Sequence, residues 1–207
     1  MTQARTRKQL QGDNSRELIL DKTERLMGTR GYAATSISDI CKACGLPASS
    51  IYWHFGSKEG VLAAVMDRGA TRFFSAIPQR DDTDDTGVEH QFAATARLLA
   101  QHPDFLRLFY ILSLERGADP VVTTLVRRVR DTAIAGFRDA ITALLPADTE
   151  AAKADRVVDE LTALAVALSD GVFIADHLEP DSTDVERMYR RLFEAVTALL
   201  PILLEEQ

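Results

Sequence analysis

The segment from Gly45 to Glu59 constrains the fold of this chain more than any other. Gly45 opens a turn and Pro47 follows it. The next two helical turns carry hydroxyl, phenol, indole and imidazole side chains. A protein core has little use for so many polar and amphipathic groups on one short helix. A DNA duplex offers phosphates and base edges that such groups contact. The segment therefore predicts a helix that lies in a groove of DNA.

A preceding helix is expected over residues 35–44. Ser36 is its candidate N-cap, and Asp39, three residues later, gives a capping box. Apolar residues at helical spacing predict one buried face on this helix: Ile37, Ile40, Cys41 and Cys44. Gly45 suits the left-handed backbone that ends a helix, and Pro47 suits the first turn of the next one. Two helices joined by such a short turn predict a helix-turn-helix.

These residues resemble the tetracycline-repressor (TetR) family of bacterial transcription regulators. The resemblance runs from about Ile19 to Met66. Its motifs are Ile19-Leu20-Asp21, Arg30-Gly31-Tyr32-Ala33-Ala34-Thr35-Ser36, Asp39-Ile40, Gly45, Ile51-Tyr52-Trp53-His54-Phe55 and Ser57-Lys58-Glu59. Met27 stands where the family usually has an aromatic residue, and Cys41 where it usually has alanine. Both are modest apolar changes that leave the pattern intact.

The resemblance implies an all-α fold of about nine helices. An amino-terminal three-helix domain with the helix-turn-helix would bind DNA, and a larger helical domain would bind ligand and dimerise. We expect the first domain at residues 1–57, with a disordered tail at residues 1–14, and the second at 58–207.

Nine residues are candidate DNA contacts: Ser36, Ser38, Ala48, Ser49, Ser50, Tyr52, Trp53, His54 and Lys58. The polar tips of Tyr52 and His54 favour phosphate contact over core packing, and the resemblance implies the same roles. Lys58 begins a helix, where a cation gains nothing from the helix dipole, so phosphate contact explains its place better. Ser36 is either a cap alone or a cap at a helix end that binds phosphate. Trp53 either packs or lies along the sugar-phosphate edge.

The net charge of −7 argues against DNA binding only when it is averaged over the chain. Residues 1–60 hold nine Lys or Arg and six Asp or Glu. The rest of the chain therefore holds 15 of its 24 basic residues and 25 of its 31 acidic residues. The basic excess lies on the part expected to meet phosphate, while the acidic part limits nonspecific binding.

The remaining sequence predicts helices only. Residues 15–30 form the expected first helix, which ends at Gly31. Further helices are expected at 58–77, at 88–101, after Pro103, and at 120–145, 149–177 and 182–204. The helix at 58–77 is about 30 Å long, enough to cross from the DNA-binding part to the rest. The polar loop at 79–87 is the expected junction between domains.

The last two helices carry more apolar surface than one partner helix covers, which predicts a four-helix dimer seam. The alternative is an intramolecular core. The expected interface residues are Leu161, Leu164, Leu168, Val172, Met188, Leu192, Val196 and Leu199. A two-fold dimer would present two helix-turn-helix units to the half-sites of a palindromic operator in double-stranded DNA.

The part of the chain after residue 57 holds most of its aromatic side chains. Bulky rings between angled helices can leave an apolar cavity. For any single ring core packing is the favoured explanation, whereas for the set the resemblance implies a pocket under the helix at 58–77. The candidate ligand residues are Phe73, Phe74, Phe92, Phe105, Phe109, Tyr110, Phe137 and Phe173. We expect a small apolar or aromatic effector that tilts the helix at 58–77 and releases the operator.

Other chemistries find little support in the sequence. Cys41 and Cys44 form one C-x-x-C pair without a second pair, so a zinc site is not expected and core packing is favoured. No catalytic, metal or cofactor motif appears, so the chain is not expected to be an enzyme. No apolar run is long enough for a membrane span and no signal peptide appears, so a cytoplasmic protein is expected. The alternative function is a DNA-binding protein of the same fold without a small-molecule effector, controlled by a protein partner or acting architecturally.

Overall fold

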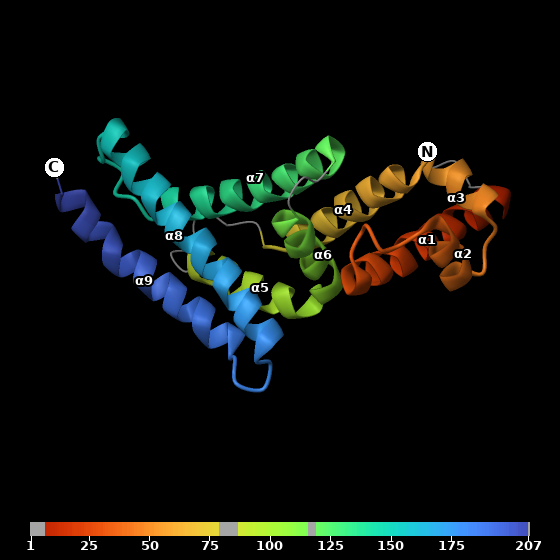
Figure 1. Cartoon of the computed structure of the whole chain (residues 1–207). Coiled ribbons are helices and arrows are strands. Elements are labelled where there is room, and N and C mark those ends of the chain that lie inside the picture. The colour runs from red at the N-terminus through yellow and green to blue at the C-terminus, as the bar shows by residue number, and fades with distance from the viewer. Residues whose placement is uncertain (1–6, 79–86, 116–118, 207) are drawn as a thin grey trace. The chain divides into compact units, whose positions relative to one another are not determined.

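The computed structural model describes residues 7–78, 87–115 and 119–206. Within these ranges the secondary structure is nine α-helices and no strand, which confirms the all-α prediction. The helices, in chain order, are α1 (Arg7–Arg30), α2 (Ile37–Cys44), α3 (Ala48–Phe55), α4 (Lys58–Ser75), α5 (Gly87–Gln101), α6 (Pro103–Leu114), α7 (Pro120–Thr142), α8 (Ala151–Leu178) and α9 (Val185–Glu205) (Figure 1). None of these described helices is both long and apolar enough to cross a bilayer.

The chain divides into two compact units whose limits differ from the expected division after residue 57. The first unit comprises the chain up to Arg72 together with His102–Val129, and the second comprises Phe73–Gln101 and Arg130–Gln207. The first unit thus contains α6 as well as the three amino-terminal helices. The expected junction at 79–87 lies, apart from its last residue, outside the described residues. The division at residue 57 remains a prediction about which part of the chain meets DNA.

In the first unit, α1 is the central helix and packs against α2, α3 and α6. The backbone of Gly28 in α1 lies so close to α6 that an added Cβ would be 2.8 Å from the carbonyl oxygen of Asp104. The core of this unit consists of fully buried apolar side chains: Ile19, Leu20, Met27, Ile40, Ile51, Leu62, Met66 and Leu108. The short helices α2 and α3 each contribute one of these residues, which holds them against α1.

Helix α1 begins at Arg7, so the disordered tail expected at residues 1–14 is wrong from residue 7 onward. The segment Arg7-Lys8-Gln9-Leu10-Gln11 consists of residues with high helix propensity, which favours continuation of the helix toward the N-terminus. The helix therefore begins earlier than residue 15, where the sequence predicts its start. Residues 1–6 lie outside the described part of the chain.

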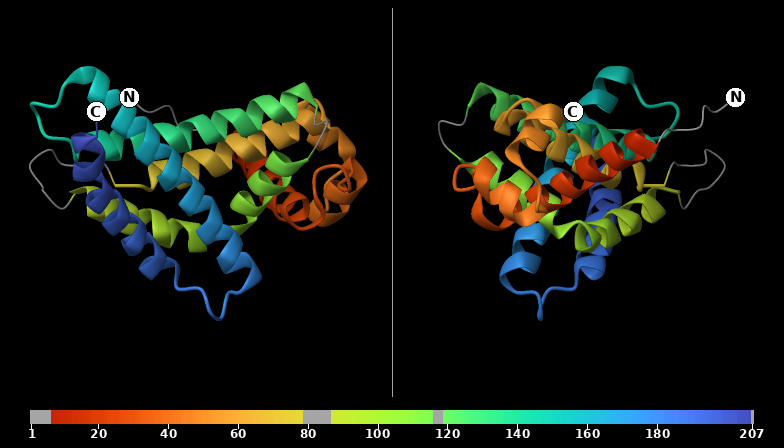
Figure 2. Two further views of the ribbon diagram at one scale, coloured as in Figure 1. Left: turned by 60° about the vertical axis from the view of Figure 1, so that its left-hand side comes forward. Right: turned by 90° about the vertical axis from the view of Figure 1, so that its right-hand side faces the viewer.

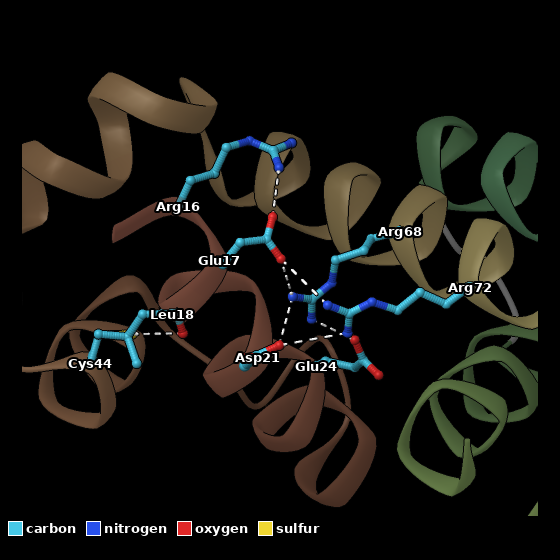
Figure 3. Close-up of polar contacts among 8 residues, drawn as sticks. All are labelled: Arg16, Glu17, Leu18, Asp21, Glu24, Cys44, Arg68 and Arg72. Atoms are coloured by element: carbon cyan, nitrogen blue, oxygen red, sulfur yellow. Dashed lines mark hydrogen bonds and ion pairs between the residues drawn. The ribbon is translucent and has the colours of Figure 1, made fainter. Parts of the chain in front are cut away.

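A cluster of charged side chains joins α1 to α4 (Figure 3). The Arg68 guanidinium on α4 donates to Glu17 at 3.0 Å, to Asp21 at 2.6 Å and to Glu24 at 2.7 Å. These three carboxylates follow one face of α1. Burial opposes the charged form of Arg68, but its hydrogen bonds with Glu24 and Glu17 outweigh that cost and raise its pKa. With a side chain only 11% exposed, Arg68 therefore fixes α4 against α1.

In the second unit, α8 and α9 lie side by side in opposite directions (Figure 2), and α5 packs against α9. The ring of Phe92 on α5 lies edge-on to Phe137 and to Phe193, each at 5.6 Å between centroids. Tyr189 on α9 is fully buried and shares a hydrogen bond with Ser169 on α8. Burial of Tyr189 raises the pKa of its phenol. These contacts make α5, α8 and α9 one packed group.

Candidate nucleic-acid interface

Helix α2 begins with the capping box that the sequence predicts. The Ser36 hydroxyl accepts a hydrogen bond from the Asp39 amide at 3.1 Å, and the Ser36 amide donates to the Asp39 carboxylate at 2.9 Å. Hydrogen bonds from Ser36 lower the pKa of Asp39. These bonds satisfy amides that a helix start leaves without partners and fix where α2 begins.

The turn between α2 and α3 is also the predicted one. Gly45 has φ 67° and ψ 23°, the left-handed conformation that glycine adopts at low cost. Its amide donates to the Cys41 carbonyl, which also accepts the Leu46 amide at 3.3 Å. Pro47 immediately precedes the first residue of α3, and its carbonyl accepts the Ser50 amide at 3.0 Å. One carbonyl at the end of α2 therefore anchors the turn that directs α3.

Helix α3 has one buried side and one exposed side. Ile51 is fully buried, whereas the Tyr52 side chain is 51% exposed and Trp53 is 77% exposed. Of the other predicted contacts on this helix, Ala48 and Ser49 are exposed and Ser50 and His54 are half-buried. Ser36, the N-cap of α2, and Ser38 in its first turn are exposed. The aromatic side chains thus face outward although burial would favour them inside, which is typical of a binding surface.

The face of α2 that was expected to be buried is buried only in part. Ile40 is inaccessible, but Ile37, Cys41 and Cys44 are half-buried. The reason is the shortness of α2, because eight residues place one apolar side chain deep in the unit and leave those one turn away near its edge. Both cysteines are free thiols.

Lys58, the predicted phosphate contact on α4, lies beside the loop that precedes α2. Its ammonium nitrogen is 4.2 Å from the ring centroid of Tyr32, a cation–π contact. The Tyr32 hydroxyl donates to the Glu59 carboxylate at 3.0 Å. Burial, together with the charge of Glu59 and this hydrogen bond, raises the pKa of Tyr32 to about 12. Tyr32 therefore holds the start of α4 in place and positions the half-buried Lys58.

His54 at the end of α3 lies against an open pocket of about 560 Å³. Arg16 also lines this pocket, and its guanidinium carbon lies 5.4 Å from the ring centroid of Phe55. Burial and the nearby Arg16 charge lower the pKa of His54. The His54 ring also packs edge-on against Trp53 at 4.5 Å between centroids. His54 thus supports the Trp53 ring and remains partly accessible.

Known proteins match both the sequence of this surface and its fold. Residues 19–65 match the sequence profile of the bacterial regulatory proteins of the tetR family. Over these residues the chain is similar to the TetR family. The repressor ComR of Escherichia coli is 43% identical over 58 residues, which cover 28% of each chain. The structure of the SmeT–triclosan complex, from Stenotrophomonas maltophilia, is 24% identical over 89% of this chain and 90% of that one, with a TM-score of 0.69. A putative regulator from Saccharomonospora viridis in complex with choline is 20% identical over 89% of this chain and 96% of that one, with a TM-score of 0.65.

The matches in sequence and in structure cover different extents of this chain. The curated relatives first matched are each aligned over only 28% to 35% of their length, and the first is aligned over the helix-turn-helix region. Over nearly the whole chain the similarity is one of fold, at sequence identities below 25%. The family consists of regulatory proteins, which agrees with the prediction that the chain is not an enzyme.

The candidate ligand residues are distributed over both units. Three lie in the first unit, namely Phe105, Phe109 and Tyr110, and five lie in the second, namely Phe73, Phe74, Phe92, Phe137 and Phe173. Five of the eight are buried and three, Phe74, Tyr110 and Phe137, are half-buried. None of them lines the pocket beside His54. They contribute to packing, and their role in ligand binding stays a prediction.

The predicted dimer interface needs correction at half of its residues. Leu161, Val172, Leu192 and Val196 are at most 3% exposed within the single chain, so they belong to the intramolecular core. Leu168 and Met188 are each 41% exposed, and Leu164 and Leu199 are half-buried. The reason is that α8 carries apolar residues on two sides, and only one side packs against its own unit.

Three residues that position this surface were missing from the sequence-based set. Tyr32 fixes the start of α4, Arg16 contacts Phe55, and the Ser57 hydroxyl accepts the Gly60 amide at 3.1 Å and caps α4. Ser57 three residues before Gly60 gives a weak cap signal in the sequence. Arg16 lies almost forty residues from Phe55, and no local pattern indicates that contact.

Proposed function

We propose that this protein is a transcriptional regulator that binds a palindromic DNA operator as a homodimer. The observation that carries the proposal is the exposed side of α3. Tyr52 and Trp53 face outward on a helix held from behind by Ile51. A helix that follows a tight turn and offers aromatic and hydroxyl groups to the outside suits a DNA major groove.

The surrounding polar groups suit a phosphate backbone. The Lys58 ammonium and the exposed hydroxyl groups of Ser36 and Ser38 lie on either side of α3 in sequence, and both kinds of group can donate to phosphate oxygens. In this proposal Ser36, Ser38, Tyr52, His54 and Lys58 contact phosphates. The short side chains of Ala48, Ser49 and Ser50 would allow α3 to approach the bases closely.

The exposed sides of α8 and α9 support the dimer. On α8, small and apolar residues follow one face and remain accessible: Ala163, Leu164, Ala167, Leu168, Gly171, Ile174 and Leu178. On α9, the corresponding residues are Met188, Ala195, Leu199 and Ile202. Such an apolar face is costly in water, and a two-fold partner would cover it. In a closed dimer the two α3 helices would read two half-sites.

We propose that a small molecule regulates DNA binding through α4, which has residues in both units. An effector that favours one position of α4 would change DNA affinity by the coupling free energy, which is typically about 1–3 kcal/mol. SmeT has been crystallised with triclosan and the Saccharomonospora regulator with choline, two ligands of different chemistry. The aromatic side chains of this chain favour an apolar or aromatic effector. The second candidate is control by a protein partner, which the exposed faces of α8 and α9 would also serve.

The test begins with selection of operator fragments by the purified protein from the genome that encodes it. Affinity is then measured by fluorescence anisotropy for the wild type and for Trp53→Ala. The matched control is Leu114→Ala, because Leu114 is also 77% exposed but lies on α6. We expect Trp53→Ala to weaken binding by roughly 5- to 150-fold, the equivalent of about 1–3 kcal/mol, and Leu114→Ala to leave it unchanged.

Two further measurements complete the test. Lys58→Gln should reduce the slope of log affinity against log salt by about one, since one phosphate contact is lost. Leu168→Arg should convert the dimer into monomer in analytical ultracentrifugation. Failure to enrich any fragment, or equal operator affinity for Trp53→Ala and the wild type, would contradict the proposed interface.

A further inference from the structure

The chain has only two cysteines, and both lie on α2, three residues apart. Side chains three residues apart on a helix are neighbours, with Cβ atoms about 5–6 Å apart. Cys41 and Cys44 are free thiols and half-buried, so both sulfurs lie near the surface of the first unit. A pair of adjacent, partly accessible thiols is a chelating group, and the proposed interface with DNA does not use it.

The surroundings of the pair are defined on one side by α1. The Cys44 sulfur lies 3.9 Å from the backbone carbonyl oxygen of Leu18, a weak hydrogen bond (Figure 3). That contact leaves the sulfur lone pairs free for another partner. The backbone of Cys41 holds the turn before α3 through its carbonyl. The thiol pair is therefore built into the last turn of α2, where the direction of the next helix is set.

We propose that Cys41 and Cys44 form a two-thiolate site for one soft, thiophilic metal ion with a filled d shell. Thiolates are soft ligands and select soft ions. Each thiol gives up its proton on binding, so one ion replaces two protons. The ion lies between the two sulfurs and closes a small ring on the helix surface.

Two alternatives for the pair fit its geometry less well. A disulfide needs Cβ atoms about 3.5–4.5 Å apart, which is shorter than the spacing along a helix, so it would distort the end of α2. Structural zinc needs four ligands. Over the described ranges, no group of three or more His, Cys, Asp and Glu side chains is arranged so that it could hold a metal ion. A bridging ion that two ligands satisfy suits both the spacing and the number of donors.

The test uses the full-length protein and the silver ion, Ag(I), which undergoes no redox reaction with thiols. Native mass spectrometry counts bound ions in the presence of 2-mercaptoethanol at roughly hundredfold excess, because only a chelating pair withstands such competition. We expect the wild type to retain one Ag(I) and to release two protons per ion in an unbuffered titration. Cys41→Ala and Cys44→Ala should each lose the ion.

Melting curves of the wild type and of both variants show whether a lost ion reflects a lost thiol or an unfolded protein. Alanine is small and apolar enough to fill either position, so both variants should unfold cooperatively and near the wild-type temperature. Should either variant fail to fold, Cys41→Ser and Cys44→Ser replace them with a hydroxyl of similar size. Loss of Ag(I) from the wild type to the competing thiol, or equal retention by a single-cysteine variant, would overturn the two-thiolate site.

A second measurement rests on the proposed function. If α3 binds DNA, an ion at the end of α2 should change operator affinity in the wild type and leave the double variant Cys41→Ala/Cys44→Ala unaffected. Ion retention is measured without DNA, so a failure of the DNA-binding proposal does not affect it. Conversely, normal operator binding with no Ag(I) retained rejects the metal site alone.

Discussion

Gly69→Ala offers a sharp test of how the first unit is packed. Gly69 lies on α4 against the ring of Phe105 on α6, and a Cβ added there would be 2.2, 2.7 and 2.8 Å from three ring carbons. The Phe105 side chain is 1% exposed, so its ring has little room to move. The substitution adds only a methyl group, and it adds it where two helices already touch.

Two opposing effects determine how much Gly69→Ala changes the free energy of unfolding. Replacing glycine by alanine inside a helix stabilises it by about 0.8–1 kcal/mol. Overpacking of a well-filled core costs about 1–3 kcal/mol. Because the contact is more than 1 Å shorter than an ordinary carbon–carbon distance of about 3.5 Å, the upper part of that range applies. We therefore expect a net loss of about 1–2 kcal/mol in the free energy of unfolding.

Gly136→Ala provides the control, because it makes the same chemical change in the interior of α7 with nothing within 4 Å of the added Cβ. It should raise the free energy of unfolding by about 0.5–1 kcal/mol. For a chain of this size about 1 kcal/mol shifts the melting temperature by roughly 2–4 °C, so the two variants should move in opposite directions. Calorimetry at one fixed protein concentration keeps any dimerisation constant. A Gly69→Ala melting temperature at or above that of Gly136→Ala would refute this account of the α4–α6 contact.

Three further substitutions test local features of the first unit. Ser36→Ala should lower the free energy of unfolding by about 0.5–2 kcal/mol in urea titrations. Because Ser36 lowers the pKa of Asp39 in the folded state, that part of the stability is present above about pH 4 and is lost as pH falls, so the deficit should shrink in acid. Gly45→Ala should cost about 1 kcal/mol in thermal melts, since its φ of 67° strains any residue with a Cβ. Arg68→Met should destabilise by about 1–3 kcal/mol, because Glu24 and the other carboxylates lose their shared partner, and this loss should diminish in high salt.

Local chemistry is what the sequence predicted well. The capping box at Ser36, the left-handed Gly45 and the start of α3 after Pro47 each depend on interactions within four or five residues. Such interactions do not change with the rest of the fold, so residue type and spacing are enough to indicate them. The exposed Tyr52 and Trp53 follow from the same local pattern.

Contacts between distant residues account for what was missed. The division of α8 into a buried side and an exposed side cannot be read from a helix that is apolar on both, so Leu161 was assigned to the dimer interface together with Leu168. The place of α6 in the first unit depends on backbone approach at Gly28, and a glycine in a helix does not reveal its neighbour. The contact of Arg16 with Phe55 likewise arises only when α1 and α3 are packed together.

The exposed surface of α3 has a cost that the rest of the first unit offsets. A helix of eight residues is too short to be stable alone in water, so α3 depends on what holds it. Ile51 gives it one buried side chain, and the turn at Gly45 fixes its start, while Tyr52 and Trp53 contribute little to the core. The stability of α3 must therefore come from its packing against α1 and α2, in a unit where Arg68 joins α1 to α4. A substitution on the outer face of α3 should consequently leave folding intact, whereas one in the α1–α4 contact should weaken folding and the interface together.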